Sequence, residues 1–594
     1  MDPASSLAEY QHRLAGRKQQ ADLLDARSAQ ISNLRLLAFA IIAAFLWLVM
    51  KGRLGAWWLL APVALFAALV LWHDRVIRAL TRARRAIHLY EWGIARIEDR
   101  WHSFGRTGDR FRQPDHVYAE DLDLFGPQGL FQLLSTARTR IGEGRLAQWL
   151  LAPAPVATVI ERQQAIAELR DALDFREQLA VAGDDIPPDF DPAKLLDWAE
   201  GPELLRNPLL RAVAPILAVA AIAAIVVAFW KAFYLPMAVV LLIELALQFH
   251  YRKRVRQVIA SVESAGEAIM LFSMLVKILE QRRFTSPLLQ SLHATLGGVA
   301  MSASSALATF STRIDLVDSR DNLILRVLNV PLLYELQAAF AVEAWRHRHG
   351  RDVRAWLNAI AETEALVSLA TYSYEHPADP FPEFIASGTQ FVGESLGHPL
   401  IPAARNVRNS VHLDQATRAL VVSGSNMSGK STYLRTIGLN AVLAMAGAPV
   451  RATSLRLSPV QVGSSLHVLD SLQTGRSGFA SELDRLRQIM TLMKAGLPVL
   501  FLMDELLHGT NSHDRYLGGQ ALLRAFMAHG AIGVVTTHDL SITEIPPDLA
   551  TQVSNAHFED RVEDGHMAFD YRLREGVVAR SNALELMRSI GLDL

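Results

Sequence analysis

Four long apolar runs interrupt the otherwise mixed pattern of this 594-residue sequence. Residues 36–50 and 54–72 form one pair, and residues 212–230 and 232–249 form a second pair that is separated by little more than Lys231. A helix of about 20 apolar residues crosses a bilayer, and the shorter first run needs its flanks or a thinner bilayer. Each pair therefore predicts a transmembrane helical hairpin, four membrane helices in all.

Two buried core helices are the alternative explanation of the first pair. The runs lack a polar face, however, and four tryptophans gather at their ends, as interfacial aromatic residues do: Trp47, Trp57, Trp58 and Trp72. Glu244 lies inside the fourth run. An intramembrane carboxylate is either a functional group or a protonated or helix-paired side chain near the bilayer edge.

Basic residues flank both pairs. They are Arg75, Arg78, Arg82, Arg84 and Arg85 after the first pair, Arg206 and Arg211 before the second, and Arg252, Lys253, Arg254 and Arg256 after it. Because basic flanks stay on the cytoplasmic side, the pattern predicts a multi-pass protein of the inner, cytoplasmic membrane with both termini in the cytoplasm.

The remaining pattern divides the chain into a multidomain order. We expect an N-terminal cytoplasmic helix (1–33), hairpin 1 (34–73), a linker helix (74–104), an all-α core domain (105–205), hairpin 2 (206–250), lever and core helices (251–380) and a mixed α/β domain (381–594). Turns are predicted near Thr285-Ser286-Pro287 and near His349-Gly350-Arg351.

Composition narrows the function classes. Apolar residues make up 51% of the chain and the mean hydropathy is +0.18, which favours membrane segments. The net charge of −1 supplies no global basic field for nucleic acid, so any DNA contact needs a local patch. The absence of cysteine excludes disulfides and thiolate metal sites. The first five residues lack the basic-then-apolar layout of a cleaved signal peptide.

One glycine-rich loop carries the clearest chemistry. It consists of Gly424, Ser425, Asn426, Met427, Ser428, Gly429, Lys430, Ser431 and Thr432. An apolar run, 419–423, precedes it and a helix-like stretch follows, which is the context of a phosphate-binding loop. Loop N–H groups cradle phosphate oxygens, Lys430 reaches the β- and γ-phosphates, and Ser431 binds Mg²⁺. The expected ligands are ATP and Mg²⁺.

Two further apolar strands end in catalytic residue types. Residues 498–503 deliver Asp504 and Glu505, the Walker B arrangement. Asp504 would hold the Mg²⁺ shell, and Glu505 would orient and deprotonate the attacking water. Residues 531–536 lead to His538, which would sense the γ-phosphate. Since the carboxyl ends of parallel strands lie at one sheet edge, these residues should converge on the loop. The alternative for His538 is a packing role, which is more common for a lone histidine.

These motifs resemble the MutS mismatch-repair family. The string SGSNMSGKSTYLRTIGLNAVLAMAGAPVRA at 423–452 is similar to its ATPase domain, as are residues 475–482, FLMDELLHGTNSHD at 501–514 and TTHDL at 536–540. Upstream, residues 122–153, Arg162-Gln163 and Gly397-His398-Pro399-Leu400 resemble the family's helical core and its lead-in to the ATPase. The similarity covers roughly 105–200 and 255–594.

The resemblance implies an ABC-type P-loop ATPase that forms a homodimer, each nucleotide site being completed by the partner. It implies that Ser477 faces the neighbour's γ-phosphate and that Gly509-Thr510-Asn511-Ser512 lines the dimer seam. It also implies DNA binding in mismatch repair.

The chain departs from the family at its mismatch-reading end. A membrane hairpin occupies the place of the mismatch-reading domain with its Phe-x-Glu wedge, and Phe175-Arg176-Glu177 has these letters only by coincidence in a helical stretch. Residues 255–375 leave little room for a DNA clamp.

Two departures fall within the ATPase. Leu507-His508 replaces Gly-Arg before the dimer loop, and Arg515 replaces a Gly. The aromatic residue that stacks on adenine is missing from Asn406-Val407-Arg408-Asn409, and Tyr571 is our candidate replacement.

Two functional hypotheses follow. The first is a membrane-anchored MutS-like ATPase that binds DNA, and the second is an ATP-driven mechanical membrane protein whose dimer closure moves the hairpins without DNA. A transporter is a weaker third, since the spans offer few polar residues beyond Glu244. The best local basic patch, Trp345 to Arg351 with Arg354 and Trp356, would grip phosphates if it lay at a helical tip, and is otherwise a solvated turn or one touching lipid headgroups.

Overall fold

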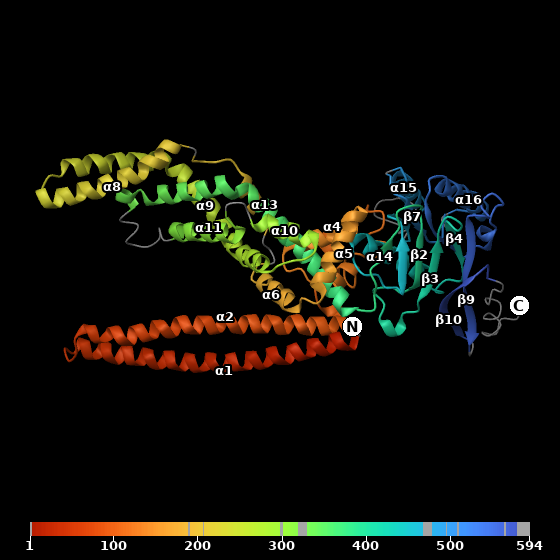
Figure 1. Cartoon of the computed structure of the whole chain (residues 1–594), viewed down its shortest axis with the longest axis horizontal. Coiled ribbons are helices and arrows are strands. Elements are labelled where there is room, and N and C mark those ends of the chain that lie inside the picture. The colour runs from red at the N-terminus through yellow and green to blue at the C-terminus, as the bar shows by residue number, and fades with distance from the viewer. Residues whose placement is uncertain are drawn as a thin grey trace. The chain divides into compact units, whose positions relative to one another are not determined.

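The computed structural model describes residues 3–187, 191–205, 207–297, 301–318, 329–466, 478–494, 496–507, 510–563 and 566–578. Contacts divide the chain into two units. Unit 1 comprises residues 1–135, 147–171 and 368–594, and unit 2 comprises residues 136–146 and 172–367. Unit 1 therefore combines the N-terminal hairpin with the C-terminal α/β region, whose strands appear in green to blue in Figure 1.

The N-terminal hairpin consists of two long helices, α1 (Pro3–Met50) and α2 (Leu60–Ile97), with a short 3-10 turn η1 (Ala56–Leu59) between them. Helix α1 is unbroken over 48 residues and passes through the compositional boundary at 33/34. Helix α2 likewise continues beyond residue 72 into the predicted linker. Figure 1 shows the two helices lying along each other.

A periodic seam explains why neither helix stops. Partly or fully buried positions recur on α1 every three or four residues from Tyr10 to Ala38. Ile31 and Ala38 pack with Leu69 and Val76, and a second cluster nearer the base joins Ala21 to Leu80 and Ala83. This is the spacing of a coiled-coil seam, and it keeps the same phase while the outer faces change from polar to apolar.

A polar contact within the seam lies near the point where the outer faces of the two helices change from polar to apolar. Arg35 Nη1 donates to His73 Nδ1 at 2.6 Å, so the hydrogen of the neutral imidazole lies on Nε2, which contacts Ser28 Oγ at 3.0 Å. All three side chains lie on the seam positions of their helices, so the contact fixes the register of the pair.

The base of the hairpin is joined to the end of helix α13 (Tyr334–Glu375) by a buried ion pair. Arg96 donates from Nε and Nη2 to the two carboxylate oxygens of Glu375, both at 2.7 Å, and the side chains are 2% and 0% exposed. Ser6 Oγ donates to Tyr374 O at 2.9 Å, and the Tyr10 ring stacks on Tyr374. Helix α13 from Ser368 onward belongs to unit 1, as does the hairpin.

The α/β region of unit 1 contains two sheets. The six-stranded sheet has the order β10-β9-β4-β8-β7-β6, in which β9, β4, β8, β7 and β6 run parallel and β10 is antiparallel at one edge. The second sheet has the order β1-β5-β2-β3. The strands are β1 Glu383–Phe384, β2 Phe391–Leu396, β3 Asn409–Leu413, β4 Ala419–Ser423, β5 Ser454–Leu457, β6 Gln461–Ser465, β7 Val499–Met503, β8 Ile532–Thr537, β9 Val553–Glu563 and β10 His566–Glu575.

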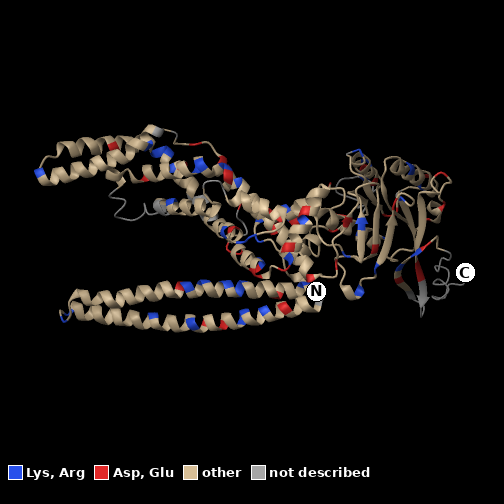
Figure 2. Ribbon diagram, in the orientation of Figure 1, with Lys and Arg blue, Asp and Glu red and all other residues tan. Residues whose placement is uncertain are grey.

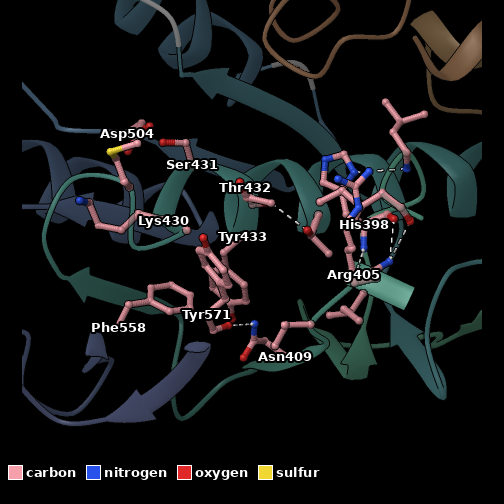
Figure 3. A pocket seen from close by; sticks show the side chains of 18 of the residues that line it. His398, Arg405, Asn409, Lys430, Ser431, Thr432, Tyr433, Asp504, Phe558 and Tyr571 are labelled. Carbon is pink, nitrogen blue, oxygen red and sulfur yellow. Dashed lines mark hydrogen bonds between the residues drawn. The ribbon is translucent and has the colours of Figure 1, made fainter. Parts of the chain in front are cut away.

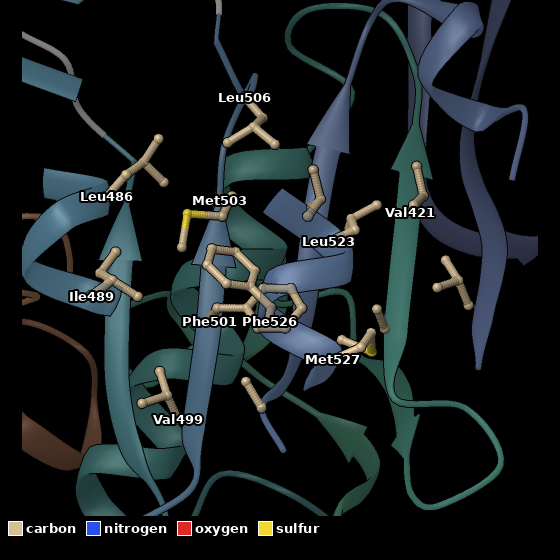
Figure 4. Packing of buried hydrophobic residues seen from close by; sticks show 14 of the residues in the cluster. Val421, Leu486, Ile489, Val499, Phe501, Met503, Leu506, Leu523, Phe526 and Met527 are labelled. Atoms are coloured by element: carbon tan, nitrogen blue, oxygen red, sulfur yellow. The ribbon is translucent and has the colours of Figure 1, made fainter. Parts of the chain in front are cut away.

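Helices α14 (Lys430–Ala446), α15 (Gly478–Leu492) and α16 (Ser512–Ala528) accompany the large sheet, with 3-10 turns η5 (Ala403–Arg405) and η6 (Leu540–Thr543). Figure 4 shows side chains of β7 interdigitating with those of α15 and α16. The rings of Phe501 and Phe526 lie 4.8 Å apart between centroids. A sheet buried by such packing needs near-continuous apolar strands, and every residue of β7 and β8 is buried.

Segments that precede the second hairpin also pack on this domain. They contain η2 (Trp101–Ser103), η3 (Asp109–Phe111), α3 (Leu130–Leu134) and α5 (Val156–Arg170). Asp121 Oδ2 accepts from Ser464 Oγ at 2.7 Å and from Leu466 N at 3.1 Å, and Arg435 Nε donates to Asp121 O. Contacts thus divide residues 105–205 between the two units.

Unit 2 is helical in its described residues. Its helices are α6 (Leu173–Gly183), α7 (Pro192–Glu200), α8 (Pro208–Lys231), α9 (Leu235–Gln281), α10 (Pro287–Gly297), α11 (Ala303–Asp318), most of α13 and the first turns of α4 (Arg140–Leu151). The turn predicted near Thr285-Ser286-Pro287 lies between α9 and α10. Phe175 is buried in α6 against Phe284, a packing role rather than that of a wedge.

The turn predicted near His349-Gly350-Arg351 is wrong, because α13 runs through it without a break. A Cβ atom on Gly350 would lie 2.2 Å from Ala199 O, so this glycine permits close helix packing instead. The basic patch is correspondingly engaged in packing: Arg346 is buried and donates to Glu343 at 2.8 Å and to Pro202 O at 2.7 Å. The buried ring of Trp345 packs on Trp198.

Among the residues that the structure describes, four helical segments are long and apolar enough to cross a membrane, by length and composition: Ala4–Met50, Ala56–Ile97, Leu209–Lys231 and Leu235–Val262. In Figure 2 the stretches of both hairpins nearest their connecting loops are largely free of charged side chains. Within the second pair Glu244 is fully buried, and neither carboxylate oxygen has a hydrogen-bond partner among the described residues.

We predict that Glu375→Ala destabilises unit 1 by about 3–5 kcal/mol, because it leaves the buried Arg96 charge uncompensated. Denaturant unfolding of the detergent-solubilised chain measures the loss. Lys18→Ala is the control: it breaks the exposed 2.9 Å pair with Glu91 on the same hairpin and should cost less than about 1 kcal/mol. Equal losses in the two variants would contradict the assigned role.

Candidate functional site

The glycine-rich loop connects the central strand β4 to the first turn of α14, as its sequence predicts. Three residues adopt positive φ angles: Gly424 (156°), Met427 (70°) and Gly429 (102°). A Cβ atom on Gly429 would lie 3.1 Å from the Tyr571 ring, so a larger residue there is opposed by strain and by crowding together. The loop therefore curls tightly at the N-terminus of a helix, where backbone N–H groups favour an anion.

Lys430 supplies a positive charge inside this loop. Its Nζ donates to Gly424 O and to Ser425 O, both at 2.9 Å. Burial lowers the pKa of Lys430, and the nearby carboxylates of Glu505 and Asp504 partly oppose that shift. The hydroxyls of Ser425 and Ser428 are buried without a hydrogen-bond partner among the described residues. Buried donors beside an ammonium group fit the oxygens of a bound polyphosphate.

The parallel register brings the acidic residues to the same edge. Ser423 pairs with Thr537 across β4 and β8, and Met503 pairs with Val535 across β7 and β8. The residues that follow these strand ends, Asp504 and His538, therefore emerge beside the loop.

Hydrogen bonds position the two acids. Thr536 Oγ1 donates to Asp504 Oδ1, and the backbone N–H of Glu505 donates to Thr536 O at 3.1 Å. Glu505 has a φ of 47°, and its Oε1 lies 3.3 Å from Nδ1 of His538. The carboxylate of Glu505 is partly exposed, which leaves it accessible to water and in contact with the histidine expected to sense the γ-phosphate.

A cavity of about 900 Å³ opens over the loop. Figure 3 shows Lys430, Ser431 and Asp504 at one end of it, His398 and Arg405 at the other, and Tyr571 between. Its lining contains these residues together with Asn426, Met427, Gly429, Thr432 and Glu505. Burial lowers the pKa of His398 to about 4, so this side chain is neutral at pH 7. The cavity thus combines the loop end, where Lys430 lies near the carboxylates of Asp504 and Glu505, with a longer polar and aromatic section.

Tyr571 lies at a bulge between β9 and β10, where its φ is 55°. Asn409 holds the bulge: its Nδ2 donates to Tyr571 O at 2.9 Å and its Oδ1 accepts from Leu573 N at 2.8 Å. The sequence pattern assigned no role to Asn409 or Arg405, although Asn409 ends the segment from which the adenine-stacking aromatic is missing and Arg405 directly precedes that segment. Asn406 instead ties the loop after β2 by donating to His398 O.

The residues expected at a dimer seam are only partly described. Ser477, His508 and Gly509 lie outside the described residues. Asn511 caps α16 by accepting from Asp514 N at 2.9 Å. Arg515, one of the departures from the family pattern, contacts Leu507 O at 3.3 Å, Thr510 O at 3.1 Å and Asp539 Oδ2 at 3.5 Å. It therefore braces the segment after Glu505 against the segment after His538.

Ser431 and Asp504 both line the cavity, consistent with a hard cation held between them. Among the described residues there is no group of three or more His, Asp or Glu side chains that could hold a metal alone. Mg²⁺ usually takes one or two carboxylates, with substrate phosphates and water completing its shell, so this sparse donor set fits it.

Residues 420–593 match the family described as MutS domain V. The chain is 37% identical over 203 residues to "Endonuclease MutS2" of Thermus thermophilus and 32% identical over 279 residues to "DNA mismatch repair protein MutS" of Brevibacillus brevis. It is also 32% identical over 246 residues to "DNA mismatch repair protein MSH3" of Phaeosphaeria nodorum. These alignments cover 33%, 45% and 40% of this chain but only 25%, 31% and 22% of the relatives.

We predict that Glu505→Gln binds nucleotide normally but hydrolyses it about 10²- to 10⁴-fold more slowly, because an amide cannot accept the proton of the attacking water. Phosphate release and fluorescent-nucleotide binding measure the two properties. Glu544→Gln, an exposed site outside the cavity lining, is the matched control and should leave both unchanged. Normal turnover in Glu505→Gln would refute the role of this carboxylate.

We further predict that Tyr571→Ala weakens ATP binding about 5- to 100-fold through loss of base stacking. Tyr571→Phe keeps the ring and should bind as wild type does. Calorimetric titration with ATP distinguishes the variants. Equal affinity of Tyr571→Ala and wild type would show that the adenine lies elsewhere.

Proposed function

Because this chain belongs to the MutS family through its C-terminal domain, we propose that it hydrolyses ATP with Mg²⁺ at the cavity over residues 424–432. The observation that carries the proposal is the parallel register of β4, β8 and β7, which gathers Lys430, Asp504 and Glu505 at one sheet edge. Bound Mg²⁺ would neutralise charge that develops on the transferred phosphoryl group. Ser431 and Asp504 would hold it.

The other residues of the proposed site act by position. Loop N–H groups and Lys430 bind the phosphates, and Glu505 orients and deprotonates the water. His538, in contact with Glu505, responds to the γ-phosphate, and Tyr571 carries the base. Two chains would pair so that Ser477 of each approaches the other's nucleotide, giving a homodimer with composite sites.

We propose that ATP controls DNA binding by the dimer, in mismatch repair or a related DNA transaction. The support is the names of the relatives, two of which are called DNA mismatch repair proteins. The chain spans less than a third of these relatives' lengths. Its DNA-binding surface must therefore be sought among its own residues.

We propose that the protein is anchored in the inner, cytoplasmic membrane by two helical hairpins, with the ATPase and both termini in the cytoplasm. Four sufficiently long apolar helices and their basic flanks support this arrangement. The proposed order is the one given by the sequence: residues 1–33, 34–73, 74–104, 105–205, 206–250, 251–380 and 381–594.

One structural observation favours a second function, in which dimer closure moves the hairpins and no DNA takes part. The Arg96–Glu375 pair connects the first hairpin to α13, and α13 leads directly into the α/β region. The packing of Arg346 and Trp345 also removes side chains from the best candidate DNA patch. A motion of the ATPase would then pass to the membrane through buried contacts.

Duplex DNA binding by the solubilised full chain separates the two functions. The DNA function predicts binding with and without ATP that weakens steeply as salt increases, because phosphate contacts release counterions. Fluorescence anisotropy of labelled perfect and mismatched duplexes measures it, and the Lys430→Ala variant tests its dependence on ATP. Absence of binding at low salt in every nucleotide state, with hydrolysis intact, would leave the mechanical function.

A further inference from the structure

A second cavity, of about 650 Å³, lies in unit 2 along helix α9, where the apolar part of this helix ends. Its lining changes character along the helix. Leu242, Leu245 and Phe249 form an apolar wall, and Arg252 and Arg256 follow one and two turns later. Asn329, shortly before α13, and Glu335, in its first turn, close the polar side.

The apolar wall is open rather than covered. Leu242 is 70% exposed, Leu245 56% and Phe249 78%. These residues belong to the candidate membrane helix Leu235–Val262. Large apolar side chains that remain exposed beside a cavity need an apolar occupant, and within a membrane helix that occupant is an acyl chain.

The two arginines of the cavity are available for an anion. Arg252 and Arg256 are exposed, four residues apart on one helix face, and neither forms a hydrogen bond or ion pair with a residue that the structure describes. Arg254, between them, lies outside the lining and over the Tyr251 ring at 5.9 Å. Two guanidinium groups on one face can hold a phosphate diester between them.

The polar side of the cavity is fixed by hydrogen bonds. Gln248 Nε2 donates to Asn329 O at 2.9 Å, and Asn329 Oδ1 accepts from Glu335 N at 3.1 Å. The Glu335 carboxylate, which also lines the cavity, adds an acceptor for hydroxyl groups. With two arginines and one glutamate the lining retains a net positive charge.

We propose that this cavity binds an anionic phospholipid of the cytoplasmic leaflet. Arg252 and Arg256 hold the phosphate, an acyl chain lies along Leu242, Leu245 and Phe249, and Glu335 accepts from a glycerol hydroxyl of the headgroup. The order of the lining, apolar and then basic, follows the order of acyl chain and headgroup across the bilayer boundary. This inference rests on the proposed membrane insertion of the second hairpin.

The test uses the full chain in mixed micelles with phosphatidylglycerol or phosphatidylcholine, and native mass spectrometry counts the retained lipid. Wild type should prefer phosphatidylglycerol about 10- to 30-fold, the gain expected from two basic side chains at a membrane surface. Arg252→Gln/Arg256→Gln should lose this preference. Excess inorganic phosphate should not displace the lipid, since phosphate alone makes no use of the apolar wall.

The matched control is Lys253→Gln/Arg254→Gln, which removes the same charge from the same turn outside the cavity lining. It should retain the preference. Equal loss in both double variants would overturn the site in favour of general attraction to basic flanks. So would displacement by inorganic phosphate, or the absence of any preference in wild type.

Flotation with vesicles of phosphatidylcholine alone separates this inference from the proposed membrane anchoring. Wild type that floats with neutral vesicles but shows no preference for phosphatidylglycerol refutes the lipid site and leaves the anchoring in place. Wild type that fails to float refutes both. The two double variants should float equally well, and unchanged ATP hydrolysis in both checks that they have folded.

Discussion

Parallel pairing of β4 with β8 and of β8 with β7 is the constraint on which the nucleotide site depends. All three strands are held in register by backbone hydrogen bonds, and every residue of β7 and β8 is buried, so a shift of one residue would exchange the side chains of two closely packed faces. The same register determines that the loop, the two acids and the histidine emerge together. The positions of these side chains at the sheet edge therefore depend on the apolar packing beneath the edge, which Figure 4 shows around Phe501 and Phe526.

The convergence of the loop, the two acids and the histidine at one sheet edge was predictable because the motifs are local. The loop, Asp504, Glu505 and His538 each follow an apolar strand within a few residues, and parallel pairing does the rest. The role of Asn409 was not predictable in this way, since it depends on a bulge between β9 and β10, far along the chain. The sequence shows only that Arg515 replaces a glycine of the family pattern. Its three contacts explain why an arginine stands there, because they join the segment after Glu505 to the segment after His538.

Packing overrides local composition at two places along the chain. Composition changes at residue 33, but the three- and four-residue spacing of the seam continues, and helix α1 follows the spacing. Gly350 among basic residues indicated a turn, yet its missing side chain makes room for Ala199 O, and α13 continues. In both cases tertiary packing, which local composition does not report, decided the outcome.

The unbroken course of α1 also sets a length. Its polar part, from Pro3 to residue 33, rises about 45 Å at 1.5 Å per residue, and α2 runs alongside it. In the proposed membrane arrangement, this polar part is a spacer between the lipid surface and the base of the hairpin, where Arg96 pairs with Glu375 of α13. This polar part is longer than a small folded domain, which is about 30 Å across, so the buried Arg96–Glu375 pair at its base lies far from the apolar ends of α1 and α2.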